Sequence, residues 1–196
     1  MSKKFKRTVA EVISFITNPA LVVVASLAVI TIRYISSSEQ YWNWLAVAIG
    51  LLLGPSSLYI VLMWLKEREV DIDITNREDR IVPLLLTTVG AVIGGYLLQQ
   101  RVGNSSLLLL SNTLVAMLVL LTIVTFVWKI SLHASTFMAA VSLVVVFRGF
   151  DFAWLYLAIL PIAWARFNLR QHTPAQVIVG ALSGVLITFS LAIILN

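Results

Sequence analysis

The sequence predicts an all-helical protein of the membrane, and two observations carry that prediction. Of its 196 residues, 60% are hydrophobic and 12% are charged, about half the charged fraction of water-soluble domains. The long apolar runs lack the alternation of polar and apolar residues that a membrane β-strand shows, so helices are expected in place of a barrel. The absence of cysteine excludes disulfides and thiol chemistry. This composition excludes an ordinary water-soluble domain, a disordered chain and a nucleic-acid-binding protein whose basic surface faces water.

The first segment has the pattern of an amphipathic helix at a membrane surface. Between residues 3 and 17, apolar residues recur at helical spacing, and Lys3, Lys4, Lys6 and Arg7 crowd the start. No convincing small-residue cleavage site follows, so we expect this segment to stay in the mature protein. The sequence therefore predicts an N-terminal amphipathic interfacial helix over residues 1–18 and a single transmembrane domain over residues 19–196.

The apolar runs predict a polytopic membrane helical bundle of six to seven spans, because a crossing needs about 20 apolar residues. The spans are expected at 19–35, 42–65, 82–99, 107–128, 133–148, 152–165 and 174–195. The fifth and sixth are short, which leaves open whether they cross the bilayer or lie partly buried in the bundle. Two pairs of glycines four residues apart, Gly90/Gly94 and Gly180/Gly184, permit close packing of helices.

The basic residues predict which side of the membrane each segment occupies. With seven crossings, the N-terminus, the loop at 66–81 and the segments at 129–133 and 166–172 share one side, with eleven Lys and Arg residues against three on the other. Setting aside the five that are candidates for function leaves six against three, and such an excess marks the cytoplasmic side. We expect a multi-pass protein of a prokaryotic-type cell membrane whose site faces the cytoplasm.

The chain has two histidines, His133 and His172, and each begins a predicted helix. Two crossings lie between them, so both are expected on the same side, near cationic residues such as Lys129 and Arg166. This set suits a phosphorylated substrate, because arginine binds phosphate oxygens and helix N-termini offer backbone N–H groups to anions. One imidazole could attack phosphorus while the other protonates the departing oxygen. The alternative is that both histidines only cap helices.

The segment from Arg166 to Gln176 resembles a known signature. Its sequence with the preceding alanine, Ala-Arg-Phe-Asn-Leu-Arg-Gln-His-Thr-Pro-Ala-Gln, is similar to S-R-x(5)-H-x(3)-D, the third signature of the type 2 phosphatidic acid phosphatases. Arg166 and His172 match at the correct spacing, whereas Gln176 stands in place of the Asp. The second signature, P-S-G-H, resembles the residues at 130–133, which keep the Ser and the His. The resemblance covers about residues 66 to 190.

This resemblance implies a role for each matching residue. His172 would be the nucleophile that forms a phosphohistidine, and His133 would protonate the leaving group. Arg166, Ser131 and Lys129 would hold the phosphoryl oxygens. The resemblance implies no metal and no other cofactor.

Gln176 departs from the family pattern. Where the family's Asp would orient the nucleophilic imidazole, Gln176 offers a neutral carbonyl, which can fix the tautomer but supports positive charge less well. The run Thr173-Pro174-Ala175-Gln176 also fits a capping box with Pro in the first helical turn. Gln176 is therefore a candidate catalytic residue that could equally be a cap.

The loop at 66–83 is the candidate for the first signature, K-x(6)-R-P, which it does not match cleanly. Arg77 and Arg80 lie three residues apart, on one face of a short helix, which suits a phosphate or diphosphate. Surface ion pairing is an equally open alternative for both. Asp71 and Asp73 could hold magnesium through a lipid diphosphate, although salt bridges to the neighbouring arginines explain them better.

Together these residues predict a membrane lipid phosphatase that hydrolyses the phosphate or diphosphate of an isoprenoid or glycerolipid through a phosphohistidine intermediate. The expected partners are this substrate and membrane lipids, without nucleic acid, and a homo-oligomer stays open. One alternative is a lipid phosphotransferase, in which an acceptor hydroxyl replaces water. Another is a non-catalytic membrane protein that binds lipid phosphates.

Overall fold

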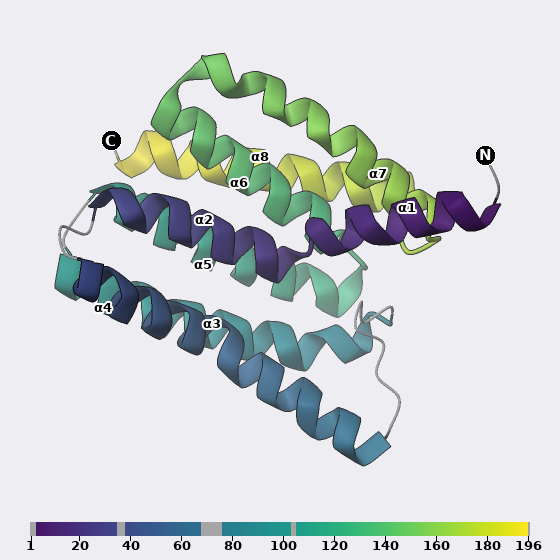
Figure 1. Ribbon diagram of the computed structural model, residues 1–196, viewed down its shortest axis with the longest axis horizontal. Coiled ribbons are helices and arrows are strands. Elements are labelled where there is room, and N and C mark those ends of the chain that lie inside the picture. Colours follow the sequence, from purple (N-terminus) through teal and green to yellow (C-terminus); the bar gives the residue numbers. More distant parts are fainter. Residues whose placement is uncertain (1–2, 35–37, 68–75, 103–104, 196) are drawn as a thin grey trace. The chain divides into compact units, whose positions relative to one another are not determined.

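The computed structural model describes residues 3–34, 38–67, 76–102 and 105–195, and the elements within these ranges are all helices. In chain order they are α1 (Lys3–Ile16), α2 (Pro19–Tyr34), α3 (Ser38–Glu67), the 3-10 helix η1 (Glu78–Arg80), α4 (Ile81–Val102), α5 (Ser105–Val127), α6 (Leu132–Arg148), the 3-10 helix η2 (Phe150–Ala158), α7 (Ile159–Asn168) and α8 (Pro174–Leu195) (Figure 1). The predicted all-helical class is confirmed.

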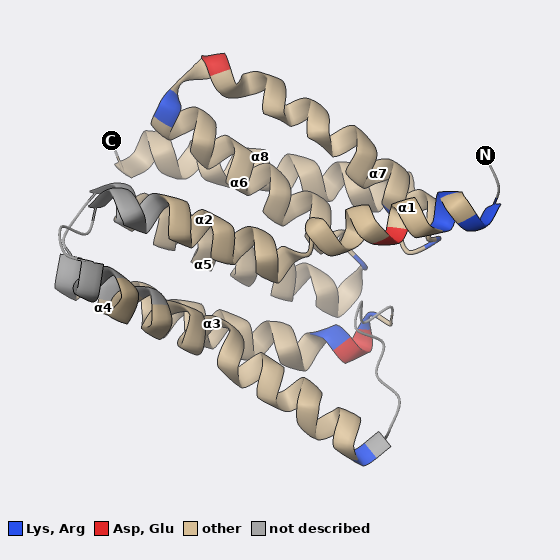
Figure 2. Cartoon of the chain, in the orientation of Figure 1, with Lys and Arg blue, Asp and Glu red and all other residues tan. Residues whose placement is uncertain are grey.

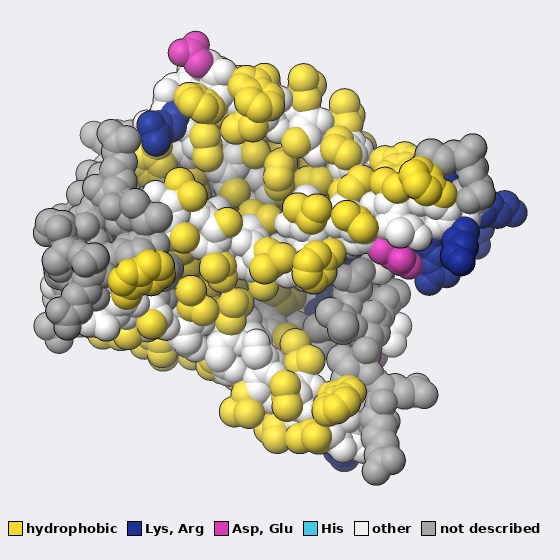
Figure 3. Space-filling view, viewed as in Figure 1, with side chains coloured by type: hydrophobic (Ala, Val, Ile, Leu, Met, Phe, Trp, Pro, Cys, Tyr) yellow, Lys and Arg dark blue, Asp and Glu magenta, His cyan; other side chains and the backbone are white. Residues whose placement is uncertain are grey.

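Several helices have the length and apolar composition of membrane spans. Within the described ranges these are Trp42–Lys66, Glu78–Leu97, Leu108–Val127, Phe150–Asn168 and Pro174–Leu195, and α1 with α2 would add a sixth if this pair, bent by 41°, is one span. Charged residues that are coloured on the long helices gather at the helix ends (Figure 2). Hydrophobic side chains cover much of the visible surface (Figure 3). The chain is thus a multi-pass membrane protein with five to six candidate spans.

Six to seven spans are expected, and the described residues contain five, or six if the bent pair is one span, so the seventh is not found among them. The predicted span at 133–148 corresponds to α6, which has 17 residues and is therefore about 25 Å long, shorter than the roughly 30 Å of a bilayer's hydrocarbon core. Nine of its residues are buried inside the protein, so α6 packs as a core helix. The predicted span at 152–165 is η2 followed by α7. Pro161 lies in the first turn of α7, just after the change from the 3-10 helix to the α-helix.

The described chain forms two compact units. Unit 1 contains residues 1–26 and 129–196, and unit 2 contains residues 27–128. In unit 2, α4 packs against α3 and α5. Gly90 brings α4 against the backbone carbonyl of Leu51, and the hydroxyls of Thr88 and Thr122 lie 3.0 Å apart. The expected boundary between an interfacial helix and a single domain stays a prediction.

Unit 1 is built around α6 and α8, which pack in parallel along their lengths (Figure 1). A methyl group at Gly180 would lie 2.7 Å from the carbonyl oxygen of Ser131, and one at Gly184 would meet that of Ser135. The glycine pair therefore lets two backbones touch, as its spacing predicts. This contact sets the N-terminal ends of α6 and α8 side by side, and both predicted histidines belong to these ends.

Helix α1 is formed where the amphipathic pattern predicts it, and it packs on α7 within unit 1. Its two buried residues are small, Ala10 and Ser14. The large apolar residues Phe5, Val12 and Ile16 are exposed on the surface of the protein. An interfacial position for α1 stays a prediction, but its polar face is a packing surface for the rest of unit 1.

Candidate active site

The start of α8 is closed by a reciprocal capping box. The hydroxyl oxygen of Thr173 accepts from the backbone N–H of Gln176 at 3.4 Å, and Gln176 Oε1 accepts from the backbone N–H of Thr173 at 3.1 Å. This is the arrangement that the spacing of Thr173 and Gln176 predicts. It holds the Gln176 side chain back over the residues that precede the helix, where His172 lies.

Gln176 also determines which ring nitrogen of His172 carries hydrogen. Its Oε1 lies 3.2 Å from His172 Nδ1. Because that oxygen already accepts from a backbone N–H, it must be the carbonyl oxygen of the amide, which only accepts, so the hydrogen lies on Nδ1. In the neutral ring the lone pair is then on Nε2. Gln176 is thus both a cap and a partner of His172, which is itself buried.

Arg166 lies at the end of α7 and connects three parts of unit 1. Its side chain is 1% exposed, and Nη1 donates to Ser14 Oγ at 2.5 Å and lies 3.5 Å from His133 Nε2. Its carbonyl accepts from the backbone N–H of Gln171 at 3.1 Å. The chain that leaves α7 is therefore fixed on Arg166 just before it reaches His172.

His133 lies in the first turn of α6 and is held by α1. Its Nε2 lies 3.1 Å from the carbonyl oxygen of Ser14 and 3.4 Å from Ser14 Oγ. Since a carbonyl only accepts, this nearest contact indicates that Nε2 carries the hydrogen. The two imidazoles thus differ in the nitrogen that donates in these contacts, which is Nδ1 in His172 and Nε2 in His133.

Ser131 links the ends of α6 and α8. It is fully buried, its Oγ caps α6 by accepting from the backbone N–H of Ala134 at 3.4 Å, and its own N–H donates to the carbonyl of Gln176 at 3.2 Å. The hydroxyl predicted to hold a phosphoryl oxygen is thus engaged as a helix cap. Lys129 is half-buried in the segment before α6. Phosphate binding by these two residues stays a prediction.

Arg77 and Arg80 belong to unit 2, so their participation in a site of unit 1 stays a prediction. Arg77 Nη1 donates to the carbonyl of Phe126 in the last turn of α5 at 3.0 Å, and its Nη2 lies 3.6 Å from a Glu78 carboxylate oxygen. The contact with Glu78 is of the kind that the alternative of surface ion pairing describes. Arg80 is buried. Asp71 and Asp73 lie outside the described residues, and the described part of the chain contains no cluster of three metal-ligating side chains.

Ser14 is the residue that sequence reasoning missed. It lies 119 positions from His133 and 152 from Arg166, and no motif surrounds it. The signal that could have found it is the pair of small residues Ala10 and Ser14, four apart on α1, which is the same spacing that marks the glycine contacts of α8.

No family model, curated protein or solved structure matches this chain.

The turn between α7 and His172 contains a strained residue. Arg170 has a φ of +55°, and its N–H donates to the carbonyl of Phe167 at 3.0 Å, next to the bond from Gln171 to Arg166. These bonds form a Schellman motif, in which the left-handed position is usually glycine.

We expect Arg170→Gly to raise the free energy of unfolding by up to about 1 kcal/mol relative to Arg170→Ala, because glycine has no Cβ to strain there. Thermal unfolding in detergent, followed by circular dichroism, measures this difference. Equal melting temperatures for the two variants would contradict it.

Proposed function

We propose that this chain is a membrane lipid phosphatase that hydrolyses the phosphate or diphosphate of an isoprenoid or glycerolipid through a phosphohistidine. The observation that carries the proposal is the contact of Gln176 Oε1 with His172 Nδ1 at 3.2 Å, since it leaves the lone pair on Nε2. A neutral imidazole with that tautomer can act as a nucleophile through Nε2, the nitrogen that carries the lone pair. The resemblance of this segment to the phosphatase signature supports the same role for His172.

The proposed reaction has two steps. In the first, His172 Nε2 forms a bond to phosphorus while the bond from phosphorus to the lipid oxygen breaks, and His133, which enters this step as the imidazolium, gives its Nε2 proton to that oxygen and becomes neutral. In the second, water attacks the phosphohistidine, His133 takes a proton from the water, and phosphate leaves as His172 is restored. Arg166 supports both steps because its buried guanidinium can stabilise charge on the phosphoryl oxygens.

The position of these residues supports a lipid substrate. His133, Arg166 and His172 lie at the ends of apolar helices, so an amphiphile with its tail in the bilayer would present its phosphate at this level. We propose that the site faces the cytoplasm, on the basis of the distribution of Lys and Arg residues.

The test is a phosphate-release screen with the purified full chain in lipid vesicles. Isoprenoid monophosphates and diphosphates and a phosphatidyl phosphate are compared, with and without a chelator and vanadate. We expect release from at least one lipid, inhibition by vanadate and no effect of the chelator. Added alcohol separates hydrolysis from phosphotransfer, because a transferase would form a new phosphate ester. Absence of release from every lipid would contradict the proposal.

The second candidate is a non-catalytic protein that binds lipid phosphates, and one observation favours it. The Nε2–H of His133 donates to a backbone carbonyl of α1 in this conformation, and that is the proton a leaving group would need. This candidate predicts binding of a lipid phosphate without release and without a trapped phosphohistidine. The screen and a trapping experiment distinguish the two.

A further inference from the structure

The last turns of α1 engage the two side chains that a phosphate would need. The hydroxyl of Ser14 accepts from Arg166 Nη1 at 2.5 Å, and its backbone carbonyl accepts from His133 Nε2 at 3.1 Å. Ser14, Arg166 and His133 are all buried, so these contacts lie inside unit 1. One residue of a helix that lies far away in sequence thus presents two oxygens where phosphoryl oxygens would bind.

The end of α1 has the electrostatic character of a weak anion. Ser14 lies two residues before the end of α1 at Ile16, so its carbonyl is among the last four, which have no partner within a helix. The aligned peptide dipoles give such an end about half a negative charge, which basic side chains stabilise. A phosphate carries roughly −1.5 to −2. Arg166 and His133 would therefore prefer a phosphate group to the end of this helix.

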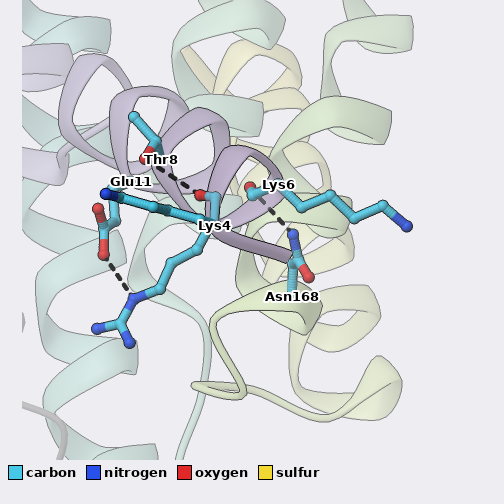
Figure 4. A network of polar contacts seen from close by, with 6 residues as sticks. Lys4, Lys6, Thr8, Glu11 and Asn168 are labelled. Carbon is cyan, nitrogen blue, oxygen red and sulfur yellow. Dashed lines mark hydrogen bonds and ion pairs between the residues drawn. The ribbon is translucent and has the colours of Figure 1, made fainter. Parts of the chain in front are cut away.

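Helix α1 is attached to the rest of unit 1 mainly through its packing on α7. Of its residues only Ala10 and Ser14 are buried, whereas Phe15 and Ile16 at its end are exposed. Near its start, Asn168 Nδ2 of α7 donates to the carbonyl of Lys6 at 3.2 Å (Figure 4). Val9 and Ile13 are half-buried, so partial apolar burial and the polar contacts of Ser14 and of the Lys6 carbonyl together attach α1.

We propose that the end of α1 is an internal mimic of the substrate's phosphate, which the phosphate displaces when substrate binds. Displacement of Ser14 turns Arg166 Nη1 and the Nε2–H of His133 toward the phosphate and the leaving oxygen. The buried site is thus closed by α1 until an anion of higher charge enters. This inference rests on the proposed phosphatase function and describes how that site is regulated.

Removal of the Ser14 hydroxyl tests the competition directly. We expect Ser14→Ala to lower the KM for a lipid phosphate about tenfold without lowering kcat, because a charge-assisted hydrogen bond that holds α1 is lost. Thr8→Ala is the matched control, since this hydroxyl is exposed on α1 and bonds only within the helix, to the Lys4 carbonyl. A lower kcat with an unchanged KM would overturn the proposal and make Ser14 a positioning residue.

Labelling of cysteine reports the movement without turnover. The chain has no natural cysteine, so Ala10→Cys places a single thiol under α1, and Thr8→Cys places one on its exposed face. We expect inorganic phosphate or vanadate to accelerate the reaction of maleimide with residue 10 and to leave the reaction with residue 8 unchanged. An unchanged or slower reaction at residue 10 would overturn the proposal even in a variant with altered kinetics.

The two experiments separate this inference from the proposed function. If phosphate exposes residue 10 but no lipid phosphate is hydrolysed, the end of α1 competes with phosphate at a binding site without turnover, and the phosphatase proposal fails. If hydrolysis is observed but residue 10 stays protected, the inference alone fails.

Discussion

Replacement of His172 by alanine is expected to abolish phosphate release, with a loss of at least about 10⁴-fold in kcat. The reason is that the substitution removes Nε2, the atom that would form the bond to phosphorus. Arg166 and His133 would still bind the phosphoryl group, so KM should change little. Phosphate release from the best lipid of the screen measures both parameters.

Trapping of the intermediate makes this expectation specific to His172. When the phosphate group of the lipid substrate is radiolabelled, rapid quenching in base should leave label on the wild-type chain and none on His172→Ala. His133→Ala is the control, because it lacks the proton donor but keeps the nucleophile. With an activated leaving group that needs no proton, His133→Ala should still become labelled. Full activity or full labelling of His172→Ala would refute the covalent mechanism.

The helices could be predicted because each long apolar run is a local property. The predicted span at 174–195 matches α8 at both ends, since Pro174 in the first helical turn and the capping residues around it are readable from the sequence. The role of α6 was harder to predict. Its 17 residues are apolar along their length, and only its packing against α8, η2 and α7 distinguishes a buried helix from a short span.

The candidate site divides in the same way. The contact between His172 and Gln176 lies within four residues, so spacing predicts it. The contacts of Arg166 and His133 with Ser14 depend on how α1 packs on α7, and hydrophobic periodicity does not encode that choice. The apolar stripe of α1 predicts a helix at the membrane surface, whereas the small residues Ala10 and Ser14 on its other side allow it to approach a buried arginine. Long-range polar contacts of this kind need the tertiary structure.

The contribution of Gln176 to catalysis is expected to be large, because it determines the tautomer of His172. In Gln176→Ala, the imidazole can place its hydrogen on either nitrogen and rotate, and we expect kcat to fall about 100-fold or more. The capping box is lost as well, which costs roughly 1 kcal/mol of stability. Activity must therefore be compared with the melting temperature of the same variant.

Gln176→Glu tests charge at constant length. A glutamate can accept from both His172 Nδ1 and the N–H of Thr173, and it adds a negative charge behind a ring that becomes cationic when phosphorylated. We expect kcat to rise about tenfold. Gln176→Asp carries the same charge on a side chain that is one methylene shorter, so it should gain less because it cannot keep both contacts.

Thr173→Ala separates the two roles of Gln176. This variant removes the hydroxyl that accepts from the N–H of Gln176 but leaves Gln176 Oε1 beside His172. If Gln176 acts on the imidazole, Thr173→Ala loses stability with little loss of kcat, whereas Gln176→Ala loses both. Equal losses of activity in the two variants, together with no gain in Gln176→Glu, would mean that Gln176 is a helix cap alone. His172 would then depend on some other group for its orientation, and the contact that carries the proposed function would lose its catalytic meaning.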